Sequence, residues 1–298
     1  MKKTINYQLT DKERLDKFLT DQFPELSRNQ IQKMIKAGNV LVNDTKAAVH
    51  KFLKTGDKLT VETFAEEIDK PAIDFKPKII FENDHCLVLD KPSGLAVEGS
   101  SNEFCLIDWL KSITPETGDE EFDKRHGLIH RLDKDVSGVM LIAKTPEFFY
   151  HLKAQFKKRT IKKIYYGLVC GRFEKDEGRL DYIMARGREG KMAARPLNQE
   201  GKQAVTEYEV IKRFNNYTYL KIKILTGRTH QIRVHFFAFN HPIAGDKLYS
   251  QKKIKDPAGL ERLFLHSYQI GFYDLDNQWQ EYQADLPESL NNLLSTLK

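Results

Sequence analysis

The sequence predicts an α+β protein in which a mixed, mainly antiparallel sheet with helices follows a small α/β module. Two observations support this fold class. From residue 78 onward, apolar segments of strand length follow one another more often than strict alternation of strands and helices would give. The first 62 residues instead combine two helical patterns with two short strand patterns. Residues 63–77 are acidic and contain two prolines, so we expect them to link a module at 1–62 to a larger domain at 78–298.

The module is expected to begin with two capped helices. Thr10 with Glu13 forms a capping-box pattern, and Ser27 with Gln30 repeats it. Apolar residues then recur at helical spacing, namely Leu15, Phe18 and Leu19 in the first helix and Ile31, Met34 and Ile35 in the second. Gly38 is placed to end the second helix.

Two short strands follow these helices, at 40–42 and 58–61, and turn patterns at 43–44 and 56–57 bound them. Three basic residues of the second helix, Arg28, Lys33 and Lys36, lie away from its apolar stripe. A basic helix face of this kind suits docking onto an RNA backbone. The segments RLDKFL (14–19), SRNQIQKMIKAGNVLVN (27–43) and LKTGDKLTV (53–61) resemble the small RNA-binding module named after a ribosomal small-subunit protein, the S-four-like domain.

The larger domain is expected to contain mostly strands. They are predicted at 78–83, 85–91, 139–144, 161–171, 204–214 and 217–225. Helices are predicted at 147–158, 229–240 and 287–297.

The whole-chain composition excludes several classes of protein. The 298 residues are 40% hydrophobic, which suffices for a sizeable core, and contain no run of roughly 18 apolar residues that could span a membrane. The first residues include lysines but no apolar segment of a secretory signal. Three widely spaced cysteines form no CxxC pattern, which favours a reducing compartment. We expect a cytoplasmic, monomeric protein.

Charge is distributed unevenly along the chain. The net charge is +6, but residues 186–233 hold eleven Lys and Arg against four acids, whereas residues 273–288 hold five acids and no base. A locally basic surface indicates a polyanionic partner, and RNA or DNA is the usual one. A solvated charged face would produce the same pattern, so charge alone only makes nucleic acid a candidate.

The segment HRLDKDVSG at 130–138 carries the first candidate chemistry, and it is close to the HRD motif of a kinase catalytic loop. The kinase interpretation fails because no Asn occurs at 126–145 and neither a DFG motif nor a GxxxxGK[ST] phosphate loop occurs in the chain. Nothing in the local spacing distinguishes Asp133 from Asp135. Metal chemistry is also not expected, because Gly127 follows His126 where a zincin would need Glu.

The segment at 225–246 (LTGRTHQIRVHFFAFNHPIAGD) carries the second candidate site. Gly227 marks a turn, Thr229 is placed to cap a helix, and Pro242 is placed to stop it. The residues expected on its buried side are Ile232, Phe236 and Phe239. Four polar residues therefore crowd the start of this helix: Arg228, His230, Gln231 and Arg233. Helix N-termini with neighbouring arginines favour anions. In the strand at 162–171, alternation places Tyr165 on the face opposite Ile164, Tyr166 and Leu168.

Seven segments occur in the order of a known family: DKPSGLAV (90–97), GLIHRLDKDVSGVMLIAKT (127–145), KKIYYGLVCG (162–171), KQAVTEYEV (202–210), TGRTHQIRVH (226–235), HPIAGDKLYS (241–250) and LFLHS (263–267). Together they resemble the RluA-type pseudouridine synthases, over about residues 78–285. With the N-terminal module, the chain is most similar to the ribosomal-RNA branch of that family. Val136 and Gly167 stand where threonine and alanine are usual.

The resemblance implies a pseudouridine synthase fold and isomerisation of uridine in RNA, most readily large-subunit ribosomal RNA. The C1′–N1 bond breaks, the uracil turns, and C5 joins C1′. This reaction needs no nucleotide, metal or other cofactor. A non-catalytic RNA-binding or ribosome-assembly factor, and an enzyme acting on transfer RNA, remain the alternatives.

The resemblance also assigns roles to residues. Asp133 matches the catalytic aspartate, either as nucleophile at C1′ or as base at C2′. Arg233 matches the arginine that pairs with it, and Tyr165 matches the tyrosine that packs on the target base and can help remove the C5 proton. Arg131 is expected to fill the gap that the extruded uridine leaves in the RNA helix. The remaining residues expected to bind RNA are Lys91, Arg228, His230 and Gln231, together with Arg28, Lys33 and Lys36 of the module.

Overall fold

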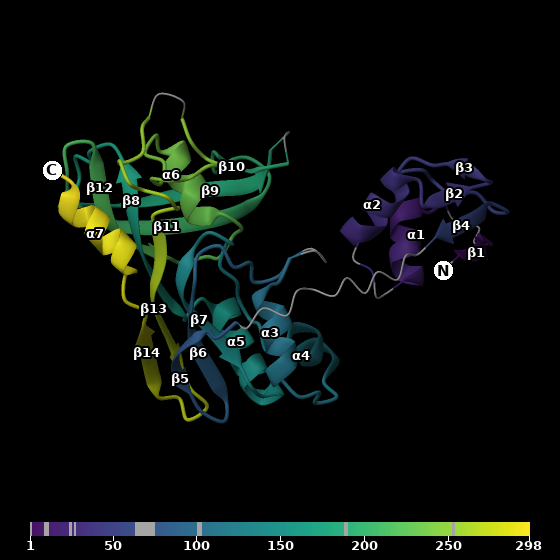
Figure 1. The fold of residues 1–298 in the computed structure, drawn as a ribbon, viewed down its shortest axis with the longest axis horizontal. Helices are drawn as coiled ribbons and strands as arrows, with labels where there is room; N and C mark the ends of the chain where they lie inside the picture. The colour runs from purple at the N-terminus through teal and green to yellow at the C-terminus, as the bar shows by residue number, and fades with distance from the viewer. Residues whose placement is uncertain are drawn as a thin grey trace. The chain divides into compact units, whose positions relative to one another are not determined.

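The computed structural model describes residues 2–8, 12–23, 26, 28–62, 75–99, 103–187, 190–251 and 254–298. The chain divides into two compact units, Met1–Asp69 and Lys70–Lys298, and each unit is described by itself (Figure 1). The predicted boundaries at 62 and 78 stay a prediction, because residues 63–74 lie outside the described residues. The predicted caps Thr10 and Ser27 also lie outside them.

The N-terminal unit combines two helices with a four-stranded antiparallel sheet. Its elements are β1 (Lys2–Asn6), α1 (Leu15–Gln22), α2 (Arg28–Ala37), β2 (Val40–Val42), β3 (Thr45–Lys46) and β4 (Lys58–Glu62). The strand order is β1-β4-β2-β3. The helices and the strands at 40–42 and 58–61 confirm the prediction, whereas β1 and β3 were not foreseen.

The core of this unit explains its fold. Leu15, Leu19 and Ile31 from the two helices are fully buried against Val40 and Leu59 of the sheet. α2 ends as the sequence predicts, because Gly38 adopts a φ of +87°. This left-handed residue lets the Gly38 and Asn39 amides donate to the carbonyls of Ile35 and Met34, at 3.1 and 3.0 Å, which satisfies the last turn.

The larger unit is built on one long sheet. Its first elements are β5 (Lys78–Glu82), β6 (Cys86–Lys91), α3 (Leu106–Ile113), α4 (Glu120–Arg125), β7 (Ser137–Ala143), α5 (Pro146–Lys158) and β8 (Lys162–Cys170). They are followed by β9 (Glu177–Arg186), β10 (Met192–Arg195), β11 (Lys202–Arg213), β12 (Tyr217–Ile224), α6 (Gln231–Ala238), β13 (Leu265–Tyr273), β14 (Trp279–Gln283) and α7 (Glu288–Thr296).

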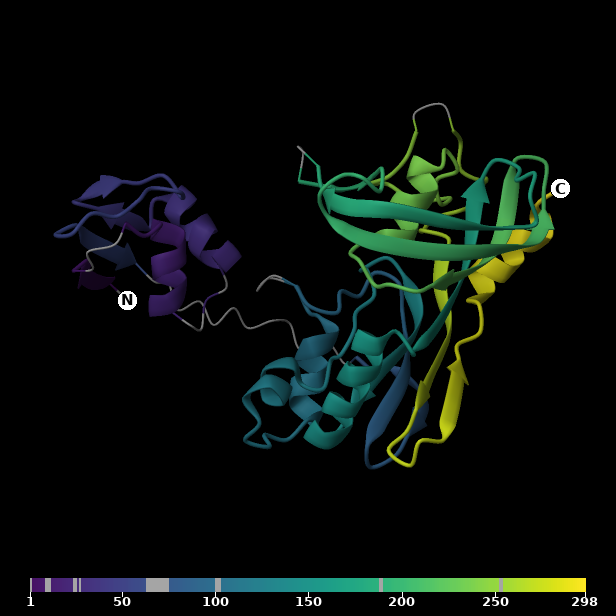
Figure 2. The same ribbon diagram turned by 180° about the vertical axis from the view of Figure 1, so that it is seen from behind.

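The strand order is β10-β9-β11-β12-β8-β13-β7-β6-β5, with β14 paired to β13. Every pair is antiparallel except β7 with β13, so the prediction of a mixed, mainly antiparallel sheet is confirmed. Figure 2 shows α3, α4 and α5 beside the half of the sheet that contains β5–β7, and α6 beside the other half. β8 and β13 therefore lie where the two halves meet.

The parallel contact between β7 and β13 requires a glycine. Gly138 pairs with Ser267 and has a φ of +115°. A Cβ at this position would lie 2.2 Å from the carbonyl oxygen of Ser267, so no other residue could occupy it without moving a strand. This explains why the segment HRLDKDVSG ends in a glycine, since β7 begins at Ser137 and pairs with β13 at Gly138.

The helix predicted at 229–240 begins later, at Gln231, and the prediction that Thr229 caps it is wrong. His230 occupies the N-cap in the left-handed region, with a φ of 55°, and its side chain caps no amide. The loop is instead held by Gln231, whose side-chain oxygen accepts from the Thr226 hydroxyl and the Arg228 amide at 2.7 and 3.0 Å. Phe239, predicted on the buried side, is 37% exposed because the helix has already ended at Ala238.

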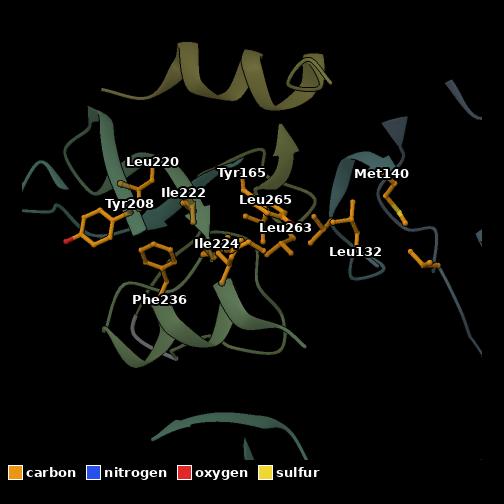
Figure 3. Close-up of a cluster of buried hydrophobic side chains, with 14 of the residues drawn as sticks. Leu132, Met140, Tyr165, Tyr208, Leu220, Ile222, Ile224, Phe236, Leu263 and Leu265 are labelled. Carbon is orange, nitrogen blue, oxygen red and sulfur yellow. The ribbon is translucent and has the colours of Figure 1, made fainter. Parts of the chain in front are cut away.

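The main core lies between the sheet and α6 and continues toward β7 (Figure 3). Tyr165 is part of it, near Leu263, Leu265 and Ile224, while Leu168 belongs to a separate cluster with α7. The predicted alternation of β8 is therefore confirmed. In the part of the chain that the structure describes, no helix is long and apolar enough to cross a membrane.

Candidate active site

A cavity of about 390 Å³ opens where the two halves of the sheet meet, which is within the range of small-molecule sites. Its walls come from the HRLD segment before β7, from β8, from the end of β12 and from the loop before α6. It brings together most of the residues that the sequence singled out in the larger unit, namely Arg131, Asp133, Tyr165, Arg228, His230, Gln231 and Arg233.

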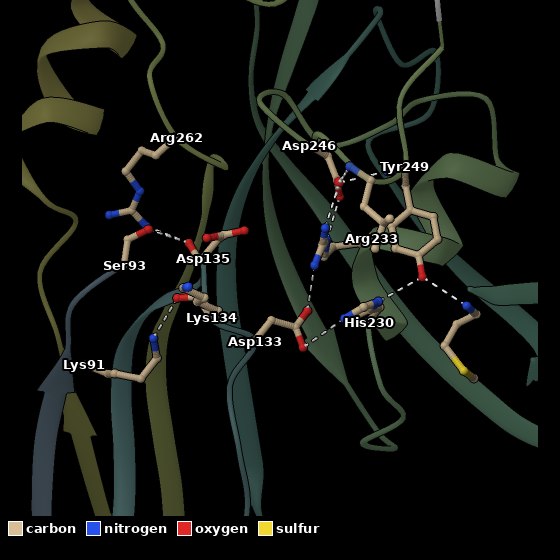
Figure 4. A network of polar contacts seen from close by, with 12 residues as sticks. Lys91, Ser93, Asp133, Lys134, Asp135, His230, Arg233, Asp246, Tyr249 and Arg262 are labelled. Carbon is tan, nitrogen blue, oxygen red and sulfur yellow. Dashed lines mark hydrogen bonds and ion pairs between the residues drawn. The ribbon is translucent and has the colours of Figure 1, made fainter. Parts of the chain in front are cut away.

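Asp133 forms an ion pair with Arg233 in this cavity (Figure 4). Arg233 Nη1 lies 3.3 Å from Asp133 Oδ2, and the side chain of Asp133 remains 18% exposed. The other side of the guanidinium is held by Asp246, with Nε–Oδ2 and NH2–Oδ1 distances of 2.7 and 2.8 Å. Burial disfavours the charge of Arg233, but the hydrogen bonds and the charge of Asp246 outweigh it and raise the pKa of Arg233. Arg233 is thus a fixed cation aimed at Asp133.

Asp246 and Tyr249 belong to the site, although the sequence analysis did not select them. Asp246 is buried and also accepts the backbone amides of Leu248 and Tyr249, each at 2.9 Å, through the oxygen that receives Arg233 NH2. The bidentate geometry orients the arginine as well as neutralising it. Both residues lie in the segment HPIAGDKLYS, and the occurrence of this segment among the ordered family motifs could have indicated that they belong to the site.

The imidazole of His230 faces Asp133 from the start of α6. Tyr249 Oη accepts the Met192 amide at 3.2 Å, which leaves the hydroxyl hydrogen free for His230 Nδ1 at 2.9 Å. This network places the imidazole proton on Nε2, which lies 3.9 Å from Asp133 Oδ1. Burial lowers the pKa of His230, so the ring is neutral at neutral pH and presents an N–H toward the carboxylate.

Tyr165 lies at the base of the cavity and is 6% exposed. Burial raises its pKa, so the phenol stays protonated at neutral pH. Its ring therefore offers an apolar surface for a planar group. Its hydroxyl is scarcely present in the deprotonated form that could act as a base.

The loop that carries Asp133 is held from behind by three side chains (Figure 4). The Lys91 ammonium donates to the carbonyls of Pro92, Leu95 and Lys134, at 2.8, 2.7 and 3.2 Å. Ser93 donates to the carbonyl of Asp135 at 2.8 Å, and Arg262 donates to the Ser137 hydroxyl at 2.8 Å.

The prediction that Lys91 contacts RNA is corrected by this arrangement. Lys91 is fully buried, and all three of its hydrogen bonds go to backbone carbonyls. Burial lowers its pKa to about 7. Lys91 therefore supports the loop from inside the protein and presents no surface to a ligand.

The geometry separates the two aspartates that local spacing left equivalent and agrees with the assignment of Asp133 by the family resemblance. Asp133 lines the cavity beside Arg233. Asp135 is exposed, does not line this cavity, and takes part in the loop through its backbone carbonyl. Only Asp133 is placed to act on a molecule bound there.

The prediction that Gln231 binds RNA is also corrected, because its side chain forms hydrogen bonds within the protein. It is 3% exposed, and its amide nitrogen donates to the Val205 carbonyl and the Thr206 hydroxyl, both at 3.0 Å. With both acceptor bonds to its oxygen also made within the chain, Gln231 has no hydrogen-bonding capacity left for RNA. Arg228 is half-buried at the cavity, and Arg131 lies at its rim with a 60% exposed side chain, 3.7 Å from Glu98.

In the N-terminal unit, the three basic residues of α2 are exposed, as predicted. Arg28 is also tied to Asp16, a carboxylate with no exposed surface, through Nε and NH2 at 3.1 and 2.9 Å. Hydrogen bonds from Arg14, Gln32 and Arg28 offset the burial of Asp16 and lower its pKa to about 2. Arg28 is therefore a fixed charge, whereas Lys33 and Lys36 project from the helix.

No group of three or more His, Cys, Asp or Glu in the described ranges is placed to hold a metal ion. The three cysteines are free and buried.

Comparison with known proteins shows the family to which the chain is similar. A family model described as RNA pseudouridylate synthase matches residues 85–238, and an S4 domain model matches residues 13–59. The chain is 33% identical over 301 residues to ribosomal large subunit pseudouridine synthase C of Vibrio parahaemolyticus, covering 96% of this chain and 93% of that protein. It is 36% identical over 308 residues to an uncharacterized RNA pseudouridine synthase of Aquifex aeolicus, covering 97% and 95%.

Two human solved structures share the fold. RNA pseudouridylate synthase domain containing 1 matches with a TM-score of 0.62 and 22% identity over 75% of this chain and 90% of that chain. RNA pseudouridylate synthase domain containing 4 matches with a TM-score of 0.59 and 24% identity over 74% and 94%. Since the family match spans the residues that carry Asp133, Tyr165 and Arg233, the chain belongs to the RNA pseudouridylate synthase family and has an S4 domain in its N-terminal unit.

Proposed function

We propose that this protein converts uridine to pseudouridine in large-subunit ribosomal RNA, with Asp133 as the catalytic carboxylate. The observation that carries the proposal is the Asp133–Arg233 ion pair inside a cavity based on Tyr165. Relatives named ribosomal large subunit pseudouridine synthase C and D, at 33% and 34% identity over 96% of this chain, support the choice of RNA.

Asp133 acts at the ribose, either by attack on C1′ or by removal of the C2′ proton. Both routes use the carboxylate of Asp133, which the guanidinium of Arg233 contacts at 3.3 Å. The neutral His230 presents its N–H toward the second carboxylate oxygen, 3.9 Å away. C1′–N1 then breaks, C5 bonds to C1′, the C5 proton leaves, and N1 gains a proton, so the product is an isomer of the substrate.

Tyr165 packs against the uracil as it turns. Its raised pKa supports a packing role over removal of the C5 proton, because the phenolate is scarcely populated. The uridine has to leave the RNA helix to reach the cavity, and the exposed Arg131 at the rim fills the space it leaves. The protein works as a cytoplasmic monomer without a cofactor, and the S4 domain binds the RNA backbone through Arg28, Lys33 and Lys36.

Pseudouridine mapping in cells with and without this protein tests the proposal. At least one pseudouridine in large-subunit ribosomal RNA is expected to disappear, and to return with the wild-type protein but not with Asp133→Asn. A loss confined to transfer RNA would move the substrate to that RNA. An unchanged map in all RNA would contradict the proposed activity.

A further inference from the structure

Lys163, the second lysine of the motif KKIYYGLVCG, lines the cavity and forms no ion pair with a described carboxylate. Lys163 precedes Tyr165 by two residues in β8, so both side chains lie on the same face, about 6.6 Å apart along the strand. Both line the cavity that contains Asp133. Among the described residues no carboxylate forms an ion pair with Lys163. Its ammonium instead lies 5.5 Å from the centre of the Phe156 ring.

The surroundings of Lys163 are those of a ligand-facing cation. His130 and Phe156 stack beside it, and its Nζ lies against Gly227, 3.9 Å from where a Cβ would stand. His130 Nε2 accepts the Leu141 amide at 3.0 Å and burial lowers the pKa of His130 to about 3, so this ring is neutral. Burial likewise lowers the pKa of Lys163 to about 8, which leaves it mostly charged at neutral pH.

The other charged groups of the cavity do not neutralise Lys163. Arg125 from α4 and Arg228 from the loop before α6 are cations. Asp133 is engaged by Arg233, and Glu98 lies next to Arg131 at the rim. A protonated lysine enclosed by apolar groups is costly unless a bound molecule brings negative charge to it.

We propose that Lys163 stabilises the uracil anion that forms when the C1′–N1 bond breaks. This inference rests on the proposed function. The bonding electrons leave with the base, and the negative charge spreads over N1, O2 and O4. With the ribose at Asp133 and the base against Tyr165, the far edge of the uracil reaches Lys163, which donates a hydrogen bond to a carbonyl oxygen. C5 then attacks C1′, so no proton needs to leave the ammonium.

The position of Lys163 favours the base over an RNA phosphate as its partner. Phosphates remain with the backbone at the rim, where Arg131 is exposed. Lys163 is less exposed than Arg131 and lines the cavity together with Tyr165, Ile224 and Phe156. A fixed cation in such a site stabilises charge that develops in the transition state more strongly than it would in water.

Steady-state kinetics on a uridine-containing RNA substrate of the wild-type protein test this role with Lys163→Met, Lys163→Arg and Lys162→Met. Lys163→Met is expected to lower kcat by about 10²–10³-fold with little change in KM, the usual effect of removing one such donor. Lys162 is the matched control, because it is the adjacent lysine of β8, does not line this cavity and pairs with Glu281 at 2.8 Å. Lys162→Met is expected to retain wild-type kcat.

The pH profile separates this role from a structural one. For the wild-type protein and for Lys162→Met, kcat/KM is expected to fall as pH rises through about 8, the pKa of Lys163, because the ammonium is lost. Lys163→Arg retains a charge at all these pH values, so its decline should move above pH 9 even if its kcat is reduced.

Three results would overturn the assignment while leaving the proposed function intact. They are wild-type kcat in Lys163→Met, a change confined to KM, or the same alkaline decline in Lys163→Arg as in the wild type. If Lys163→Met does not fold, which its unfolding curve will reveal, the profile of Lys163→Arg alone decides. An inactive wild-type protein would instead contradict the proposed function.

Discussion

Asp246 illustrates how a residue that does not contact the substrate can determine the site. Arg233 is buried, with a 7% exposed side chain, and the two short hydrogen bonds that it donates to Asp246 fix its orientation toward Asp133. Without that carboxylate, Arg233 would be a buried cation whose nearest counter-charge is the catalytic group itself.

Asp246→Asn is therefore expected to lower both stability and activity. Breaking one side of a buried ion pair typically costs about 3–5 kcal/mol of unfolding free energy. Urea unfolding measures this loss, and turnover of the folded fraction measures the effect on kcat. Asp276→Asn, at an exposed position, serves as the control and should stay within about 0.5 kcal/mol of wild type. Equal stability of the two variants would contradict the role given to Asp246.

Among the elements, α6 carries residues of the site and also a buried histidine whose ring makes no hydrogen bond to any described residue. Both ring nitrogens of His235 lack a partner in the described structure, and the residue has no exposed surface. Burial lowers the pKa of His235 to about 4, with only partial opposition from the charge of Asp181. The unfolded chain therefore binds a proton at a higher pH than the folded chain does.

The lowered pKa of His235 determines how the free energy of unfolding changes with pH. Below the ordinary histidine pKa of about 6.5, the unfolded state takes up the proton first, so stability falls as pH decreases toward 4. His235→Leu is expected to reduce this loss by up to about 1.4 kcal/mol per pH unit between about pH 6 and 4. Denaturant unfolding at several pH values measures it, with the exposed His85→Gln as control. An unchanged slope in His235→Leu would mean that His235 is accessible to protons in the folded state.

Local sequence patterns predicted some of the helices and strands and missed others. The helix α5 and the strands β6, β8, β11 and β12 follow local periodicity, and the structure confirms them. The start of α6 does not, because Gln231 bonds to Thr206, a residue 25 positions earlier, and this contact replaces the local cap expected at Thr229. The strands β13 and β14 were also missed. β13 pairs with β7 and β8, which are distant in sequence, whereas β14 pairs with β13 across a short connection.

The same limit applies to the site residues, some of which the sequence predicted correctly and some of which it did not. Motif matches named Asp133, Tyr165 and Arg233, and the structure brings them to one cavity. Their spacing in the sequence could not reveal that Lys91 and Gln231 point inward, since burial is a property of the folded chain. Nor could it distinguish Asp133 from Asp135, which differ only in the surroundings that β8 and α6 supply.

At the scale of the whole molecule, the chain has two units with separate cores, and the proposed function assigns the chemistry to the larger unit and contacts to the RNA backbone to α2 of the smaller one. Lys33 and Lys36 project from α2 of the S4 domain. The double variant Lys33→Gln/Lys36→Gln is expected to raise KM and leave kcat unchanged, because the cavity lies in the other unit.

RNA binding at several salt concentrations checks this division. Each lost phosphate contact reduces the slope of log affinity against log salt by about 0.7–0.9, so the double variant should lose roughly 1.5. Lys58→Gln is the control, because Lys58 lies on β4 and pairs with Asp44 at 3.6 Å. A double variant that keeps the wild-type slope and KM would show that α2 does not contact RNA.

We expect Asp133, and not its neighbour Asp135 in the same loop, to carry out the isomerisation. Tritium release from RNA labelled at C5 of uridine tests it most directly, using the wild-type protein, Asp133→Asn and Asp135→Asn. We expect release by the wild type and by Asp135→Asn, and a loss on the order of 10²–10⁴-fold or more in Asp133→Asn with folding retained. Undiminished release by Asp133→Asn would contradict it.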